Sequence, residues 1–577
     1  MALVIHYKNG KLINSGLTYP KATPAPVYKS ENKNTFVMGE VFDTSFEQVV
    51  NSDWVNNPSV LNNFDGAISI VKAEDAECVF ATDLNGIESW YIYHKEDVFI
   101  LSDNFWDIVK IVRPKQSDLD IDYIKTCTFM SANGDTVVDG LKVVFPTTIG
   151  RYDAKQNVLT LEKYSVFRYT SEIKDVEEAA DRMDKILDQA MKNIKQTCGD
   201  VRYGIGVSGG LDSRVIPHYA KKNGMDIVGF NVCVPRPHGF FLSQSCKNAK
   251  KIAKAFDMPY ENTRWDAATV EEKIRLKVMH YPLGGGRNSF KFEPNMPKFD
   301  VLLTGGSGLI VGSMLPVKIN DWSRDELVNF MSSFFNGVNN CRTFSSRAKR
   351  GLNYIFGLKL NADSKSNSFF SAKDICFIEK SNSIAAFVDK GLKIGQTNLE
   401  IYEDYFANVI GFRNRYGAYE SILGQKRSFS IYVPFMLKET LKWDPKLLFD
   451  RVVLKRLIVK YIPEVKDVQS EQFEAAPGKK VVLWRKFCNM VEFLVRGNGA
   501  ATDEFWMKKR SMKKKLQQRL NNSCTWFKSS FGEKANGIDN RVLKSKNCEF
   551  MINIWEFKVF IDTLETQEYL NFNFSNT

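Results

Sequence analysis

The stretch Ser208-Gly209-Gly210-Leu211-Asp212-Ser213 lies between a short apolar run, 201–207, and an amphipathic run, 212–222. This order predicts a buried strand, a tight loop and a helix. Paired glycines let the backbone approach an anion closely, and a helix start offers unpaired N–H groups to it. The two serines add hydroxyl donors, and the aspartate suits a phosphate site mainly as a Mg²⁺ ligand. All six residues are therefore predicted to hold phosphates, with Asp212 on the metal.

Strands and helices are expected to alternate after this loop. Residues 227–234 and 301–304 are short and apolar, whereas 243–256 has apolar side chains at helical spacing. Such alternation predicts an α/β fold with a doubly wound parallel sheet, where ligands bind outside the carboxyl ends of the strands. Pro217 is expected to bend or shorten the first helix. The chain after about residue 320 is predicted to be mostly helical.

The N-terminal part has a different pattern. Strands are predicted at four short apolar or alternating runs: 67–71, 90–93, 98–101 and 143–145. Asn9-Gly10 predicts a tight turn, and 176–197 has the spacing of an amphipathic helix. The change in pattern predicts two domains, residues 1–172 and 173–577.

Composition and charge narrow the class of protein. The chain has 577 residues, is 44% hydrophobic and carries a formal net charge of +12. That charge allows an anionic partner, but a solvated surface explains it equally well. The ten cysteines include no Cys-x-x-Cys pair, which argues against a structural zinc or iron–sulfur site. Without a signal pattern or a run of about 18 apolar residues, a cytoplasmic protein with no membrane span is expected.

The string SGGLDS resembles the PP-loop of the ATP pyrophosphatases, and its context resembles the asparagine synthetase family. Weaker family motifs recur in order at Phe64-Asp65-Gly66, Asp83–Gly86, Ser102-Asp103, Thr136–Pro146 and Lys455–Leu457. The resemblance implies an N-terminal class II glutamine amidotransferase-like domain, an Ntn-like α/β/β/α sandwich. It also implies a PP-loop ATP-binding domain with a helical C-terminal extension.

The resemblance further implies ligands and their contacts. ATP and Mg²⁺ would bind at the loop. Backbone at Val228–Asn231 would hold adenine, and Gly305 and Gly306 would approach the α-phosphate.

Several positions depart from the family. Ala2 replaces the cysteine nucleophile, so the N-terminal domain is expected to be inactive toward glutamine. The logic is similar to that of β-lactam synthetases and lasso-peptide cyclases, which adenylate a carboxylate for attack by a substrate amine. In the synthetase half, Leu309 and Ser430 stand where the family has acids, and Ser470 stands where it has a lysine.

Four cations could replace the missing lysine: Lys479, Lys480, Lys466 and Arg214. Each is also open to the simpler interpretation of a solvated surface residue. The same choice holds for the basic stretch Lys508–Arg519, which is either a solvated helix face or a docking surface for an acidic partner.

The sequence thus leaves three functions open. The first is an ATP-dependent, amide-forming ligase acting on a small-molecule, peptide or glycan carboxylate. The second is a degenerate nucleotide-binding or scaffold protein, as a homodimer or in a biosynthetic pathway complex. The third is a PP-loop enzyme that modifies tRNA. The amidotransferase-like half and the absence of paired cysteines argue against the third, so nucleic acid is not the expected partner.

Overall fold

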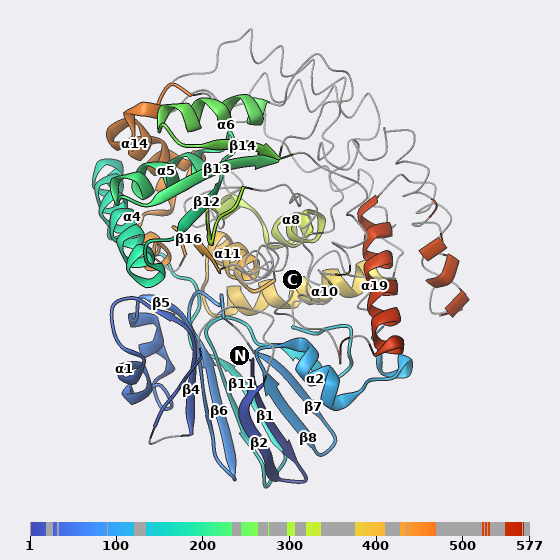
Figure 1. Cartoon of the computed structure of the whole chain (residues 1–577). Coiled ribbons are helices and arrows are strands. Elements are labelled where there is room, and N and C mark those ends of the chain that lie inside the picture. The colour runs from blue at the N-terminus through green and yellow to red at the C-terminus, as the bar shows by residue number, and fades with distance from the viewer. Residues whose placement is uncertain are drawn as a thin grey trace.

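The structure, a computed structural model, describes most of the chain in separate segments. These are residues 2–18, 27–31, 34–88, 90–120, 134–232, 244–263, 297–305, 319–335, 375–409, 427–433, 435–468 and 548–567, with isolated residues at 275, 278, 518, 522–523, 525–527, 529–530 and 569. Figure 1 shows the N-terminal strands below and a parallel sheet with its helices above.

Two antiparallel sheets form the N-terminal part. The first has the order β2-β1-β8-β7-β9, with β1 at Ala2–Lys8, β2 at Lys11–Thr18, β7 at Tyr91–Lys95, β8 at Val98–Ser102 and β9 at Leu141–Val143. The second has the order β11-β10-β6-β5-β4-β3, with β3 at Val27–Lys29, β4 at Thr35–Val41, β5 at Gly66–Ala73, β6 at Glu77–Thr82, β10 at Thr148–Asp153 and β11 at Val158–Lys163. The predicted turn at Asn9-Gly10 joins β1 to β2, and both residues have positive φ, 50° and 72°.

The two sheets pack face to face, and a helix covers each outer face. Alternate residues of β1, such as Leu3 and Ile5, share a buried core with Phe80 of the second sheet. Helix α1 (Phe46–Asn51) adds Val49 and Val50 to the core on the far side of the second sheet. Helix α2 (Phe105–Val112) packs its buried face on the first sheet. The layers are therefore helix, sheet, sheet and helix, as predicted.

The third sheet is wholly parallel and has the order β14-β13-β12-β15-β16. Its strands are β12 at Arg202–Gly206, β13 at Asp226–Val232, β14 at Tyr260–Thr263, β15 at Val301–Thr304 and β16 at Arg427–Ser430. The chain starts in the middle with β12, adds β13 and β14 on one side, and then adds β15 and β16 on the other. This reversal between β12 and β15 is the topological switch point of a doubly wound sheet.

Helices near the sheet connect its strands and join it to the rest of the chain. They are α4 at Val176–Cys198, α5 at Leu211–Lys222 and α6 at Gln244–Ala255. Asp175 caps α4 by accepting the Glu177 N–H at 2.7 Å. Helix α5 runs five residues beyond Pro217, so the expected shortening is wrong.

The C-terminal part is largely helical among the described residues. Its longer helices are α8 at Arg324–Phe335, α10 at Ile375–Lys393, α11 at Asn398–Val409, α14 at Val452–Tyr461 and α19 at Cys548–Thr566. Phe560 of α19 packs on Trp106 of α2, with ring centroids 5.4 Å apart, so the last helix contacts the N-terminal part (Figure 1). Strand β16 interrupts the helical region, and this was not predicted.

Within the described segments, no helix is both long and apolar enough to cross a membrane. Cys78 and Cys198 are free thiols, whereas Cys246 on α6 is disulfide-bonded. Disulfides are rare in the reducing cytosol, and the cytoplasmic location stays a prediction.

Candidate functional site

The glycine loop leaves the middle strand of the parallel sheet at its carboxyl end. Val207 extends β12 by donating its N–H to the Phe230 carbonyl at 2.9 Å. The chain then turns through residues 208–210, and α5 begins at Leu211. Since β13 and β15 flank β12 on opposite sides, the loop lies at the switch point, where doubly wound sheets bind their ligands.

The two serines of the loop hold its shape. Ser213 Oγ accepts the Ser208 N–H at 3.0 Å, and the two hydroxyl oxygens are also 3.0 Å apart. Ser208 Oγ in turn accepts the Gly210 N–H at 3.0 Å. Gly210 provides no side-chain cap for α5. The loop is thus a preformed turn before a helix start that an anion can cap.

Arg214 follows the loop directly in the sequence, and its side chain is fully buried. Its guanidinium donates to the carbonyls of Gly209 at 2.8 Å, Gly210 at 3.2 Å and Val468 at 2.6 Å. The interpretation of Arg214 as a solvated surface residue is therefore wrong. Lys466, another candidate cation, is exposed.

Two further strand ends meet Asp212. Gly305 follows β15, and a Cβ added there would lie 3.0 Å from the Asp212 carbonyl carbon and 3.1 Å from its Cβ. Tyr432 follows β16 and donates its hydroxyl to the Asp212 carbonyl oxygen at 3.4 Å. Burial, and then the nearby charge of Asp212, raise the pKa of Tyr432 well above its usual value, so the hydroxyl stays a donor. The carboxyl ends of β12, β15 and β16 thus converge around Asp212.

The expected adenine segment, Val228–Asn231, lies on β13 next to the loop strand. Val228 is buried and pairs with Gly204 in the parallel ladder, and Phe230 stacks on Phe299 at 5.6 Å. Asn231 is half-buried near the carboxyl end of the strand. Of these residues, Asn231 is therefore the one nearest the edge at which the loop emerges.

Several predicted positions lie outside the described residues. They are Gly306, Leu309, Ser470, Lys479, Lys480 and the basic residues of the stretch Lys508–Arg519. Ser430 is described as the last residue of β16, opposite Thr304 of β15.

The carboxylates of the described segments can be compared with the ligands that Mg²⁺ needs. Among these residues, no group of three or more His, Cys, Asp or Glu could hold a metal ion. Magnesium in nucleotide sites is usually held by one or two carboxylates together with phosphates and water. Asp212 at the switch point fits such a shared ion and does not fit a cage made by protein alone.

Two acidic residues of the N-terminal motifs accept hydrogen bonds from backbone amides. Asp103 accepts the N–H of Leu3, the residue after Ala2 on β1, at 2.8 Å. Asp83 accepts the N–H groups of Ile68, Asn85 and Gly86 at 2.8–3.0 Å. Burial raises the pKa of Asp83 to about 6, although these hydrogen bonds oppose the shift. Both carboxylates therefore have a structural role, because they hold backbone segments of the N-terminal part in place.

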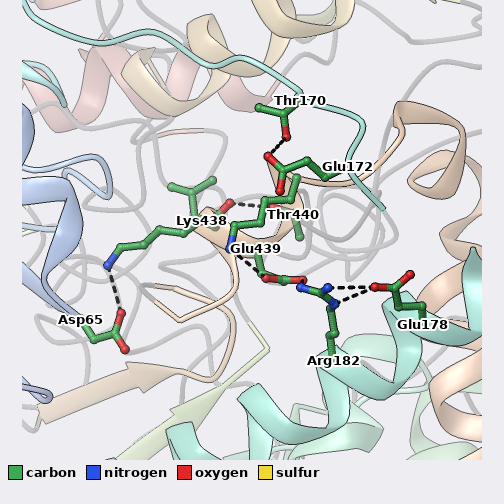
Figure 2. A network of polar contacts seen from close by, with 10 residues as sticks. Asp65, Thr170, Glu172, Glu178, Arg182, Lys438, Glu439 and Thr440 are labelled. Atoms are coloured by element: carbon green, nitrogen blue, oxygen red, sulfur yellow. Dashed lines mark hydrogen bonds and ion pairs between the residues drawn. The ribbon is translucent and has the colours of Figure 1, made fainter. Parts of the chain in front are cut away.

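Sequence reasoning missed a polar network between the two parts of the chain. Figure 2 shows Lys438 pointing toward Asp65, and Arg182 lying between Glu178 and Glu439. Lys438 Nζ donates to the Phe64 carbonyl at 2.7 Å and to Asp65 at 3.0 Å. Arg182 contacts Glu178 at 2.8 Å and Glu439 at 3.6 Å. The Glu178–Arg182 pair has the i,i+4 spacing of a helix, whereas no spacing in the sequence relates Lys438 to Asp65 or Arg182 to Glu439.

Comparisons with known proteins add little at this distance. No family model matches the chain, and no curated relative matches it. One similar solved structure is glutamine phosphoribosylpyrophosphate amidotransferase from B. subtilis complexed with ADP and GMP, at 14% identity over 45% of this chain, with a TM-score of 0.17. A second, described as the allosteric regulatory enzyme of purine biosynthesis, has 13% identity over 56% of this chain and a TM-score of 0.18. The matches span 59% and 70% of those chains, and with such TM-scores neither bears on the site.

Proposed function

We propose that the chain is an ATP-dependent ligase that joins a carboxylate to an amine without taking nitrogen from glutamine. A carboxylate oxygen attacks the α-phosphorus of ATP, the bond from that phosphorus to the bridging oxygen breaks, and pyrophosphate leaves. The amine nitrogen then attacks the acyl carbon, the bond from this carbon to the bridging oxygen breaks, and AMP leaves with that oxygen. The amine gives up a proton to the medium. The acid is a small molecule, a peptide side chain or a glycan uronate.

The position of the loop carries this proposal. A Ser-Gly-Gly turn at the switch point of a parallel sheet, opening a helix without a side-chain cap, suits the phosphates of a nucleotide. A tight turn with a purely structural role would not require the Ser-Gly-Gly sequence, the switch-point position and the uncapped helix start all at once. The close approach of Gly305 to Asp212 adds a second backbone segment at the same edge.

Each loop residue has a role in this proposal. Ser208 and Ser213 would exchange their mutual hydrogen bond for phosphate oxygens, and the first amides of α5 would face the same anion. Asp212 would hold Mg²⁺, which when bound neutralises phosphate charge. Ala2 carries no nucleophile, which supports an amine that does not come from glutamine.

Release of AMP and pyrophosphate from Mg·ATP, in the presence of panels of carboxylic acids and amines, tests the proposal. We expect Asp212→Ala to lower the rate by about 10²-fold or more, since one preorganised charge at a phosphoryl centre has that effect. Asp226→Ala is the matched control, because Asp226 is an exposed carboxylate at the opposite, amino end of the same sheet. The ligase proposal is wrong if no acid elicits pyrophosphate, or if both variants match the wild type.

A degenerate nucleotide-binding or scaffold protein is the second candidate. The described residues hold no acidic cluster for metal, and Arg214, one of the candidate cations, is engaged by three carbonyls. This candidate predicts saturable binding of Mg·ATP at the loop, weakened by Asp212→Ala, with no AMP formed from any acid. Light scattering of the full chain would reveal whether it forms a homodimer.

A further inference from the structure

Arg214 is buried, and its guanidinium bonds to the backbone of the glycine loop. Its side chain is fully buried in the first turn of α5, and its guanidinium donates to three backbone carbonyls. Burying a guanidinium is costly unless its donors are satisfied, and charge-assisted hydrogen bonds are about twice as strong as neutral ones. The contacts with Gly209, Gly210 and Val468 therefore hold these three carbonyls firmly.

The bonded carbonyls determine where the loop amides point. In a trans peptide, the C=O of one residue and the N–H of the next point in opposite directions. Fixing the carbonyls of Gly209 and Gly210 on the guanidinium therefore turns the N–H groups of Gly210 and Leu211 away from it. The Gly210 N–H is donated to Ser208 Oγ at 3.0 Å, a place that a phosphate oxygen can take.

The third carbonyl links the loop to a distant part of the chain. Val468 follows α14 and the short helix η9 (Pro463–Val465). Helix α14 packs beside α4 and α5, so the guanidinium joins the glycine loop to the chain that follows α14 and η9.

We infer that Arg214 is a positioning residue: it aims the amides of the glycine loop at a bound anion and couples the loop to the chain at Val468, just after η9. The consequence for nucleotide binding rests on the proposed function, whereas the coupling does not. Lysine cannot replace Arg214, because a single ammonium lacks the planar fork that spans three carbonyls.

Hydrogen exchange of the full chain without nucleotide tests the coupling. We expect Arg214→Lys and Arg214→Met to speed exchange by about 10-fold or more at 209–211 and at 462–468 together, since each lost bond to a charged donor is worth that much. Lys222→Met, an exposed change on the same helix, should alter neither segment. Unchanged exchange in both segments, or an equal rise throughout the parallel sheet, would overturn the inference.

Equilibrium binding of Mg·ATP tests the consequence. We expect the dissociation constant to rise by about 10–100-fold in Arg214→Lys, and further in Arg214→Met. Should the wild type bind no ATP, the proposed function fails, and the exchange experiment still decides the coupling. Should Arg214→Met not fold, Arg214→Lys decides both measurements. Wild-type affinity in a variant whose loop exchanges faster would refute the aiming of the amides.

Discussion

Asp212 is the residue on which three strand ends converge, and Gly305 leaves no room for a side chain beside it. A methyl group at position 305 would lie 3.0–3.1 Å from backbone and Cβ atoms of Asp212. Gly305→Ala therefore requires Asp212 and the end of β15 to move apart by a few tenths of an ångström, at a cost of about 1–3 kcal/mol in overpacking. We expect weaker Mg·ATP binding in this variant, measured by calorimetry.

Gly206→Ala is the matched control for Gly305→Ala. Gly206 ends β12, and a Cβ there would meet only the Phe230 ring at 3.9 Å, an ordinary contact. Both variants add one methyl group at the carboxyl end of the sheet. Equal affinities for the two variants would show that the closeness of Gly305 to Asp212 has no bearing on binding.

At the scale of elements, periodic or capped segments could be predicted and a short edge strand could not. The predicted strand at 301–304 matches β15, and the helix predicted at 176–197 matches α4 to within one residue. Strand β16 reads Arg-Ser-Phe-Ser, with only Phe429 apolar, and owes its state to pairing with β15. Pro217 did not shorten α5, because tertiary packing outweighs local propensity at this buried position.

The start of α4 shows how a single cap supports an element. Asp175 accepts the Glu177 N–H at 2.7 Å and lies at the positive end of the helix dipole. We expect Asp175→Ala to lower the free energy of unfolding by about 0.5–2 kcal/mol and Asp175→Asn by much less, because asparagine also caps. Urea titrations of the three proteins measure this, and an alanine variant as stable as the asparagine variant would contradict it.

At the scale of the whole molecule, contacts distant in sequence hold the N-terminal sandwich to the helical region. Lys438 and Asp65 are 373 residues apart, and Tyr169, which follows the last N-terminal strand, donates its N–H to Glu400 of α11 at 2.8 Å. The Tyr169 hydroxyl donates to Glu403 of the same helix. No sequence pattern predicts such pairs, because each depends on two surfaces that meet only after folding.

Glu403 makes this contact sensitive to pH. Burial, opposed by the Tyr169 hydroxyl and aided by the charge of Glu400, raises the pKa of Glu403 to about 8. A carboxyl whose pKa rises on folding stabilises the fold fully below its unfolded value, about 4.5, and this stability is lost as the pH rises through about 8. Glutamine mimics the protonated acid at every pH. We therefore expect Glu403→Gln to match the wild type near pH 5 and to be more stable than it near pH 9, by on the order of 1–3 kcal/mol.

Urea unfolding of wild type and Glu403→Gln across pH 5–9 measures this difference, from which all other titrating groups cancel. Glu162→Gln serves as the control, because Glu162 is exposed on β11 and its variant should follow the wild type at each pH. A constant gap between Glu403→Gln and the wild type would mean that Glu403 does not titrate in this range. A gap that opens in acid would mean that Glu403 is ionised in the fold and that its charge is stabilised by the surrounding donors.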